Sequence, residues 1–84
     1  MSEGTVMEPI PVTPEDRAML DNWFTYHSPT PEQLPKYQDI RDWANHLGLI
    51  ICSHVPPCAD RTAALRKLRE CVMTANAAIA CGGK

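Results

Sequence analysis

The sequence lacks long apolar runs, and no stretch of about 20 apolar residues occurs in it, which excludes a helical membrane span. No basic segment precedes an apolar one near residue 1, so we expect no secretory signal. Glycine is scarce at four residues while proline reaches eight, so the connections between elements should be stiff. A chain of 84 residues forms one small domain and leaves no room for a large enzyme.

The sequence also has few positive charges: it contains eight basic and ten acidic residues and has a net charge of −2. Residues 1–42 hold three basic and eight acidic residues, whereas residues 43–84 hold five basic and two acidic ones. Proteins that bind duplex DNA usually carry a basic face and a high isoelectric point. We therefore expect no DNA binding.

The sequence contains no CxxC pair, although it has four cysteines: Cys52, Cys58, Cys71 and Cys81. Cys52, His54 and Cys58 are close enough in sequence to begin a metal site, but no fourth ligand lies near them. Disulfides are rare without a secretion signal, and free cysteine packs as a small apolar residue. We predict free thiols, with neither a metal nor a cofactor.

Residues 1–12 are predicted to form a flexible arm, because Pro9 and Pro11 disfavour a helix. Its apolar residues either lie on a neighbouring surface or stay disordered, and they include Met7, Ile10 and Val12. Thr13 is a favourable N-cap and Pro14 suits the first turn, so a short helix is predicted over 14–24. The folded domain is therefore assigned to residues 13–84.

Two longer helices are predicted beyond the proline-rich connection at 25–35. The first ends before Pro56, and its apolar stripe has helical spacing at Tyr37, Ile40, Ala44, Leu47, Ile51 and His54. The second begins at a cap provided by Cys58 or Asp60, ends at Gly82, and repeats the spacing at Leu65, Leu68, Val72, Ala75 and Ile79. Matching stripes and a short turn predict an antiparallel helical hairpin. The predicted fold is all-α, with a short N-terminal helix before this hairpin.

The apolar stripes are wider than the single seam of a hairpin requires. Trp43, Ile50, Met73 and Ala77-Ala78 flank the seam, and the alanine-rich stretch 74–80 allows helices to approach closely. Extra apolar surface on so small a domain indicates that hairpins pack on other hairpins. We predict a compact helical oligomer without a stable monomer.

No catalytic pattern accompanies the three histidines, His27, His46 and His54. The sequence has no Ser–His–acid arrangement, no HExxH motif and no phosphate-binding loop. A single helical hairpin also offers no deep pocket within one chain. We predict that the protein is not an enzyme.

Residues suited to ligand binding gather around the proline-rich connection. Tyr26 and His27 are planar side chains there, and Lys36 and Arg41 follow at the start of the next helix. Planar groups stack on nucleobases, and Lys or Arg pairs with phosphate. Alternatively, Tyr26 covers the hydrophobic seam and Arg41 pairs with a nearby acid. Arg61, at the start of the last helix, is a further candidate for binding an anion.

Two longer motifs carry a resemblance: residues 23–29 read WFTYHSP and residues 72–80 read VMTANAAIA. Between them lie Lys36-Tyr37, Ile40-Arg41, Pro57, Asp60-Arg61, Leu65 and Leu68. In this combination, residues 23–80 resemble the phage anti-CBASS cyclic-nucleotide sponges of the second type. That family shares a helical hairpin domain with one group of Thoeris inhibitors.

The resemblance implies an anti-defence function. Family members form compact hexamers in the host bacterial cytoplasm and bind cyclic di- and trinucleotides such as cGAMP without cleaving them, which starves the CBASS effector. It implies that Tyr26 stacks on a base and that either Arg41 or Lys36 meets a phosphate. A second, trinucleotide site is also implied at a junction of several hairpins. Family members tend to have a basic residue straight after the alanine-rich helix, and the segment 81–84 departs from that pattern.

Two other interpretations stay open from the sequence. The chain could be a helical interaction module that binds a host protein through its hairpin surface, or a phosphodiesterase that uses His27. Recovery of intact ligand separates a sponge from an enzyme. Absence of nucleotide binding favours the interaction module.

Overall fold

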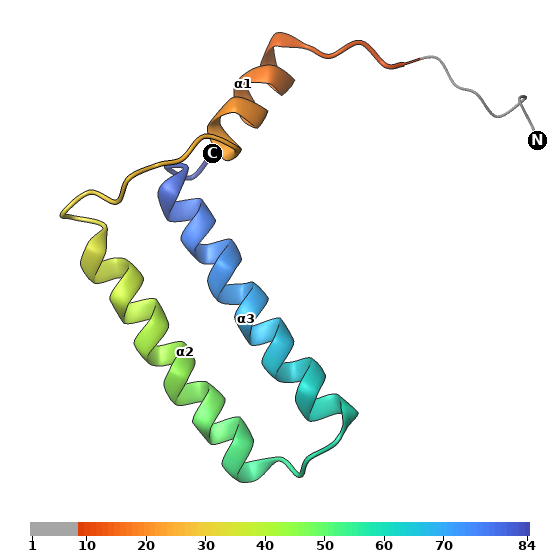
Figure 1. The fold of residues 1–84 in the computed structure, drawn as a ribbon, viewed down its shortest axis with the longest axis vertical. Helices are drawn as coiled ribbons and strands as arrows, with labels where there is room; N and C mark the ends of the chain where they lie inside the picture. The colour runs from red at the N-terminus through yellow and green to blue at the C-terminus, as the bar shows by residue number, and fades with distance from the viewer. Residues whose placement is uncertain (1–8) are drawn as a thin grey trace, which may run out of the picture.

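The computed structural model describes residues 9–84, which form three α-helices and, over that range, no strand. The helices are α1 (Pro14–Trp23), α2 (Leu34–His54) and α3 (Ala59–Ala80). α2 and α3 lie side by side and run in opposite directions, and α1 lies beyond the end where α2 begins and α3 finishes (Figure 1). The all-α prediction is confirmed, whereas residues 1–8 of the predicted arm lie outside the described residues.

The start of α1 follows from its first four residues. The Thr13 hydroxyl accepts a hydrogen bond from the Asp16 amide at 3.0 Å, and the Asp16 carboxylate accepts one from the Thr13 amide at 3.2 Å. This capping box satisfies amides that the helix itself leaves without partners. α1 ends at Trp23, one residue before the predicted end, and Phe24 is its C-cap.

The same reciprocal pair precedes α2. The Thr30 hydroxyl accepts from the Gln33 amide at 3.3 Å, and the Gln33 side-chain oxygen accepts from the Thr30 amide at 3.1 Å. At its other end, His54 donates from Nδ1 to the Ile50 carbonyl at 2.9 Å before Pro56 prevents continuation. The two hydrogen bonds between Thr30 and Gln33 therefore fix the end of the proline-rich connection where α2 begins.

Cys58, rather than Asp60, caps α3. Its sulfur accepts a hydrogen bond from the Arg61 amide at 3.4 Å. At the other end, Gly82 and Gly83 have φ of 68° and 79°, a conformation that glycine adopts at little cost. The Gly83 amide donates to the Ala78 carbonyl and the Gly82 amide to the Ile79 carbonyl, which is a Schellman termination of the helix.

The predicted stripe is correct along α3 but drifts along α2. The five predicted α3 positions are all half-buried: Leu65, Leu68, Val72, Ala75 and Ile79. On α2 the half-buried positions after Ala44 are Gly48 and Ile51, followed by the C-cap Val55, while Leu47 and His54 are exposed. A straight helix repeats every 3.6 residues rather than 3.5, so a strict heptad stripe moves off the facing surface. A Cβ at Gly48 would meet Leu68 Cδ2 at 3.7 Å, so the seam passes over this glycine.

The single chain has no enclosed core. None of residues 9–84 is buried, and the helices form one layer within extents of 52 × 43 × 15 Å. The radius of gyration is 19.1 Å, whereas a compact chain of this length has a radius of about 12 Å. Large apolar side chains stay in contact with solvent, among them Trp43 at 71% exposure and Met73 at 60%.

Candidate functional site

Tyr26 lies in the connection between α1 and α2 and is 83% exposed. Side-chain hydrogen bonds to backbone carbonyls of α1 hold the residues on both sides of it. The Thr25 hydroxyl donates to the Asp21 carbonyl, and His27 donates from Nε2 to the Asn22 carbonyl at 2.6 Å. The aromatic ring is therefore presented outward from a tied segment.

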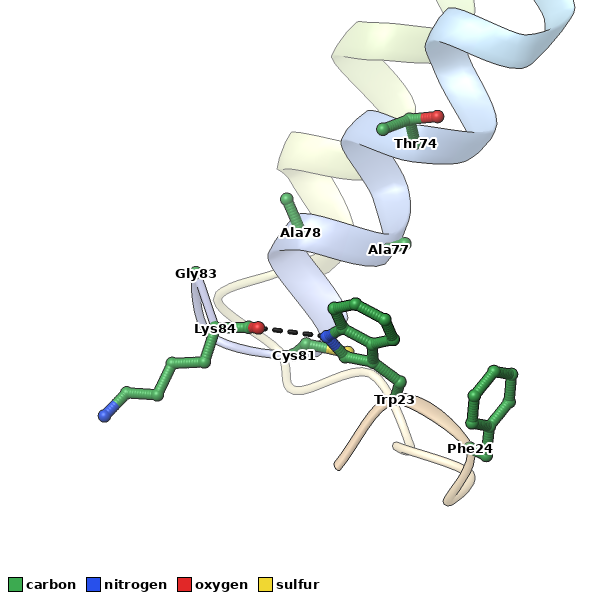
Figure 2. Close-up of a pocket in the computed structure, with 8 residues that line it drawn as sticks. All are labelled: Trp23, Phe24, Thr74, Ala77, Ala78, Cys81, Gly83 and Lys84. Atoms are coloured by element: carbon green, nitrogen blue, oxygen red, sulfur yellow. Dashed lines mark hydrogen bonds between the residues drawn. The ribbon is translucent and has the colours of Figure 1, made fainter. Parts of the chain in front are cut away.

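Three side chains fasten this connection to the end of α3. Gln33 Nε2 donates to the Ile79 carbonyl at 3.2 Å, Asn22 Nδ2 to the Cys81 carbonyl at 3.2 Å, and Trp23 Nε1 to the Lys84 carbonyl at 3.0 Å (Figure 2 shows the last). The last carbonyls of a helix have no hydrogen-bond donor within the helix, and these three side chains provide donors at the end of α3. We call Asn22, Trp23 and Gln33 the clamp. The clamp sets the position of Tyr26 and His27 relative to α3.

Lys36 and Arg41 are both exposed on α2 but do not share a face. They are five residues apart, which places their side chains about 140° apart around a helix with 3.6 residues per turn. A ligand stacked on Tyr26 can therefore meet one of them, and not both, from the same direction on one chain.

Arg41 is bound to an amide rather than to a carboxylate. Its Nη2 donates to Gln38 Oε1 at 2.9 Å, and Gln38 Nε2 donates in turn to Asp42 Oδ1 at 2.8 Å. A guanidinium has five N–H donors, so this one contact leaves donors for an anion. The structure thus favours a charged group presented to solvent over the alternative of an ion pair with Asp42.

Arg61 is half-buried in the first turn of α3, at the opposite end of the paired helices from Tyr26. α2 has 21 residues, and a helix of that length spans about 30 Å. One chain therefore brings Tyr26, His27 and Lys36 to one end, places Arg41 further along α2, and holds Arg61 at the other end. These five residues cannot surround one small ligand within a single chain.

A groove that the sequence did not indicate lies between the end of α1 and the end of α3 (Figure 2). Its volume is about 510 Å³, and it is lined by residues that include Trp23, Phe24, Ala77, Ala78, Cys81 and Lys84. The Lys84 side chain extends away from the two rings (Figure 2). The rings of Trp23 and Phe24 meet edge to face, with centroids 6.5 Å apart and planes at 75°. We call this the aromatic groove. The sequence placed Trp23 and Phe24 only at the end of the first predicted helix and in the motif at 23–29, and the proximity of Cys81 could not be inferred from it.

A second hollow, of about 330 Å³, follows the α2–α3 seam and is named here the seam groove. It is apolar, with Trp43, Leu68 and Cys71 on its walls and Asp39 among the residues that border it. The half-buried Asn76 carries a side-chain oxygen that is buried without a hydrogen-bond partner. The seam groove lies on a surface that a single chain leaves uncovered.

Residues 9–84 carry neither a metal-binding cluster nor a membrane-spanning helix. No group of three or more His, Cys, Asp or Glu side chains is placed to hold a metal ion within residues 9–84. None of the three helices described there combines the length and apolarity needed to cross a bilayer.

Comparison with known proteins places the chain in a family. No curated protein and no solved structure matches the chain. The family model described as the Acb2/Tad1 hairpin domain matches residues 16–80, which is about three quarters of the chain and includes the clamp, Tyr26, His27, Lys36, Arg41 and Arg61. This match supports the phage anti-defence role that the motifs at 23–29 and 72–80 implied. The chain belongs to the Acb2/Tad1 hairpin domain family.

Proposed function

We propose that the protein binds cyclic di- and trinucleotide messengers in the host bacterial cytoplasm and, without cleaving them, withholds them from the CBASS effector. The observation that carries the proposal is Tyr26, 83% exposed on a segment tied at both sides, within the family match over residues 16–80. An aromatic face held outward is suited to stacking on a base. Lys36 and Arg41 follow on α2 and are suited to phosphate.

Assembly supplies what one chain lacks. None of residues 9–84 is buried, and the candidate residues lie at both ends of α2 and α3. Covering a large apolar side chain such as Trp43 or Met73 contributes about 1.5–3 kcal/mol each. We expect these surfaces to be covered by further copies, in the hexamer that the resemblance implies.

A two-fold arrangement of chains fits the chemistry of a cyclic dinucleotide. The ligand has two bases, two phosphates and approximate two-fold symmetry, and an isologous interface presents each residue twice. One Tyr26 and one cation from α2 on each chain then become two stacking faces and two positive charges. Two cations match the ligand's charge of −2, although the protein as a whole is acidic.

The surroundings of two of the three histidines, His27 and His54, support binding without hydrolysis. His27 uses Nε2 in the 2.6 Å hydrogen bond to the Asn22 carbonyl, and His54 uses Nδ1 for the Ile50 carbonyl. Both rings therefore satisfy backbone groups at helix ends. General base catalysis requires a ring nitrogen within reach of the attacking group, usually oriented by a third residue.

Native mass spectrometry of the protein with a panel of cyclic di- and trinucleotides tests this function. We expect an oligomer that carries ligand at a fixed stoichiometry, and heat-released ligand that still runs as the cyclic species on chromatography. Linear products that increase with protein concentration would show an enzyme instead.

A second function is favoured by the breadth of exposed apolar surface, which includes Leu49 at 61% as well as Trp43 at 71%. Such a surface suits a helical module that binds a host protein. In the same experiment, an intact oligomer that binds none of the cyclic nucleotides would favour this module over the sponge.

A further inference from the structure

The described part of the N-terminal arm, residues 9–12, carries apolar side chains that are exposed to solvent. In residues 9–12, Ile10 is 84% exposed and Val12 is 55% exposed. Pro9 and Pro11 alternate with them and hold the backbone near the extended polyproline conformation. The family match begins at residue 16, so this segment lies outside the matched hairpin domain.

The aromatic groove has the chemistry to receive such a segment. Grooves lined by aromatic rings bind proline-rich extended segments, and here Trp23 and Phe24 form that lining. The seam groove offers a single aromatic ring, that of Trp43, whereas the aromatic groove offers two. The paired rings therefore favour the aromatic groove for the uncharged segment Pro-Ile-Pro-Val at residues 9–12.

Residues 9–12 cannot enter the aromatic groove of their own chain. Ile10 is three residues from Thr13, so an extended backbone carries it at most about 11 Å from that residue. Trp23 and Phe24 lie at the far end of α1, a helix of ten residues that is about 15 Å long. Thr13 has extended φ and ψ of −81° and 161°, and the described part of the arm leads away from the paired helices (Figure 1).

We propose that residues 9–12 of one chain dock in the aromatic groove of a second copy. The proposal rests on the assembly within the proposed function and adds to it a contact outside the matched hairpin domain. Arm and groove lie at opposite ends of α1, so two copies related by a two-fold axis exchange arms reciprocally and the contact closes. Ile10 and Val12 then lie against Trp23, Phe24 and the small alanines of α3.

Disulfide trapping in the full chain tests the contact. Ile10→Cys is introduced into a background with Cys52→Ser and Cys58→Ser. One version keeps Cys81, on the wall of the aromatic groove, and carries Cys71→Ser. The matched version keeps Cys71, on the wall of the seam groove, and carries Cys81→Ser. Isotopically light and heavy chains are mixed, oxidised mildly and analysed by non-reducing electrophoresis and peptide mass spectrometry.

We expect a disulfide between the introduced cysteine and Cys81 that joins light to heavy chains, and no such product in the matched version. A bridge requires Cα atoms within about 7 Å, so the product reports docking directly. A link within one chain, a link to Cys71, or an assembled protein without any link would overturn the proposal. An oligomer that binds cyclic nucleotides but forms no link overturns the arm contact alone, whereas a protein that sediments as single chains overturns the assembly as well.

A second measurement does not depend on cysteine chemistry. In a Trp43→Phe background, Trp23 is the remaining tryptophan and reports on the aromatic groove. Ile10→Asp should shift its emission to longer wavelength, because the ring loses its cover. Thr5→Asp adds the same charge to the arm outside residues 9–12 and should leave the emission unchanged. Equal spectra for the two variants in an assembled protein would contradict the docking.

Discussion

Replacing Tyr26 with alanine removes the stacking face and leaves the scaffold in place. Tyr26 is 83% exposed and lies outside the α2–α3 seam, so the helices do not depend on its ring. Stacking on an aromatic side chain contributes about 1–3 kcal/mol per base. A two-fold site contains the ring twice, which makes the expected loss roughly 2–6 kcal/mol, or about 30-fold to more than 10⁴-fold in affinity.

Isothermal titration calorimetry with a cyclic dinucleotide measures this loss, and sedimentation velocity checks that the assembly is unchanged. Tyr26→Phe is the matched control, because it keeps the ring and removes only the hydroxyl, and it should bind nearly as well as the native chain. Unchanged affinity of Tyr26→Ala in a normal oligomer would show that the ring does not stack on the ligand. The ligand site would then have to be sought near Arg61.

Three further predictions concern the helices. Only one of the single variants Lys36→Ala and Arg41→Ala should weaken cyclic dinucleotide binding, because the two side chains point apart around α2. The loss should be about 10- to 100-fold, and the remaining binding should depend less steeply on salt concentration. Equal losses of affinity for the two variants in calorimetry would contradict that geometry. Thr13→Ala should lower the free energy of unfolding by about 1 kcal/mol, which corresponds to a fall of roughly 4–8 °C in the Tm measured by circular dichroism. Thr13→Ser keeps the capping oxygen, so its Tm should be unchanged. Ile79→Asp places an unpaired charge in the seam and should dissociate or unfold the oligomer at a cost of about 2–4 kcal/mol; unchanged sedimentation would refute the inferred packing.

Helix boundaries were predictable because local chemistry sets them. The Thr13 hydroxyl and the Asp16 carboxylate need only each other to begin α1, and Pro56 ends α2 by its own geometry. The cap of α3 was left open between Cys58 and Asp60, and Cys58 holds it. A thiol is a weak acceptor, so ranking by acceptor strength would have selected the acid.

The course of the α2 stripe and the clamp depend on tertiary geometry instead. Gly48 replaces Leu47 in the seam because small differences between 3.5 and 3.6 residues per turn accumulate along α2. Asn22 and Gln33 find their acceptors 59 and 46 residues away along the chain. A lone amide in a sequence does not say which distant carbonyl it will meet, so neither the clamp nor the aromatic groove could be predicted.

The clamp also explains why a chain without a buried residue in 9–84 can still position a ligand side chain. Its three donors come from the end of α1 and the residue before α2, and they all bind carbonyls at or beyond the end of α3. These bonds fix the start of the connection at Asn22 and its end at Gln33, with Tyr26 between them. Tyr26 therefore has a defined place on each chain before any copy joins another. Assembly then has only to bring the Tyr26 rings of two chains together, because the clamp hydrogen bonds at the end of α3 already set the position of each ring on its own chain.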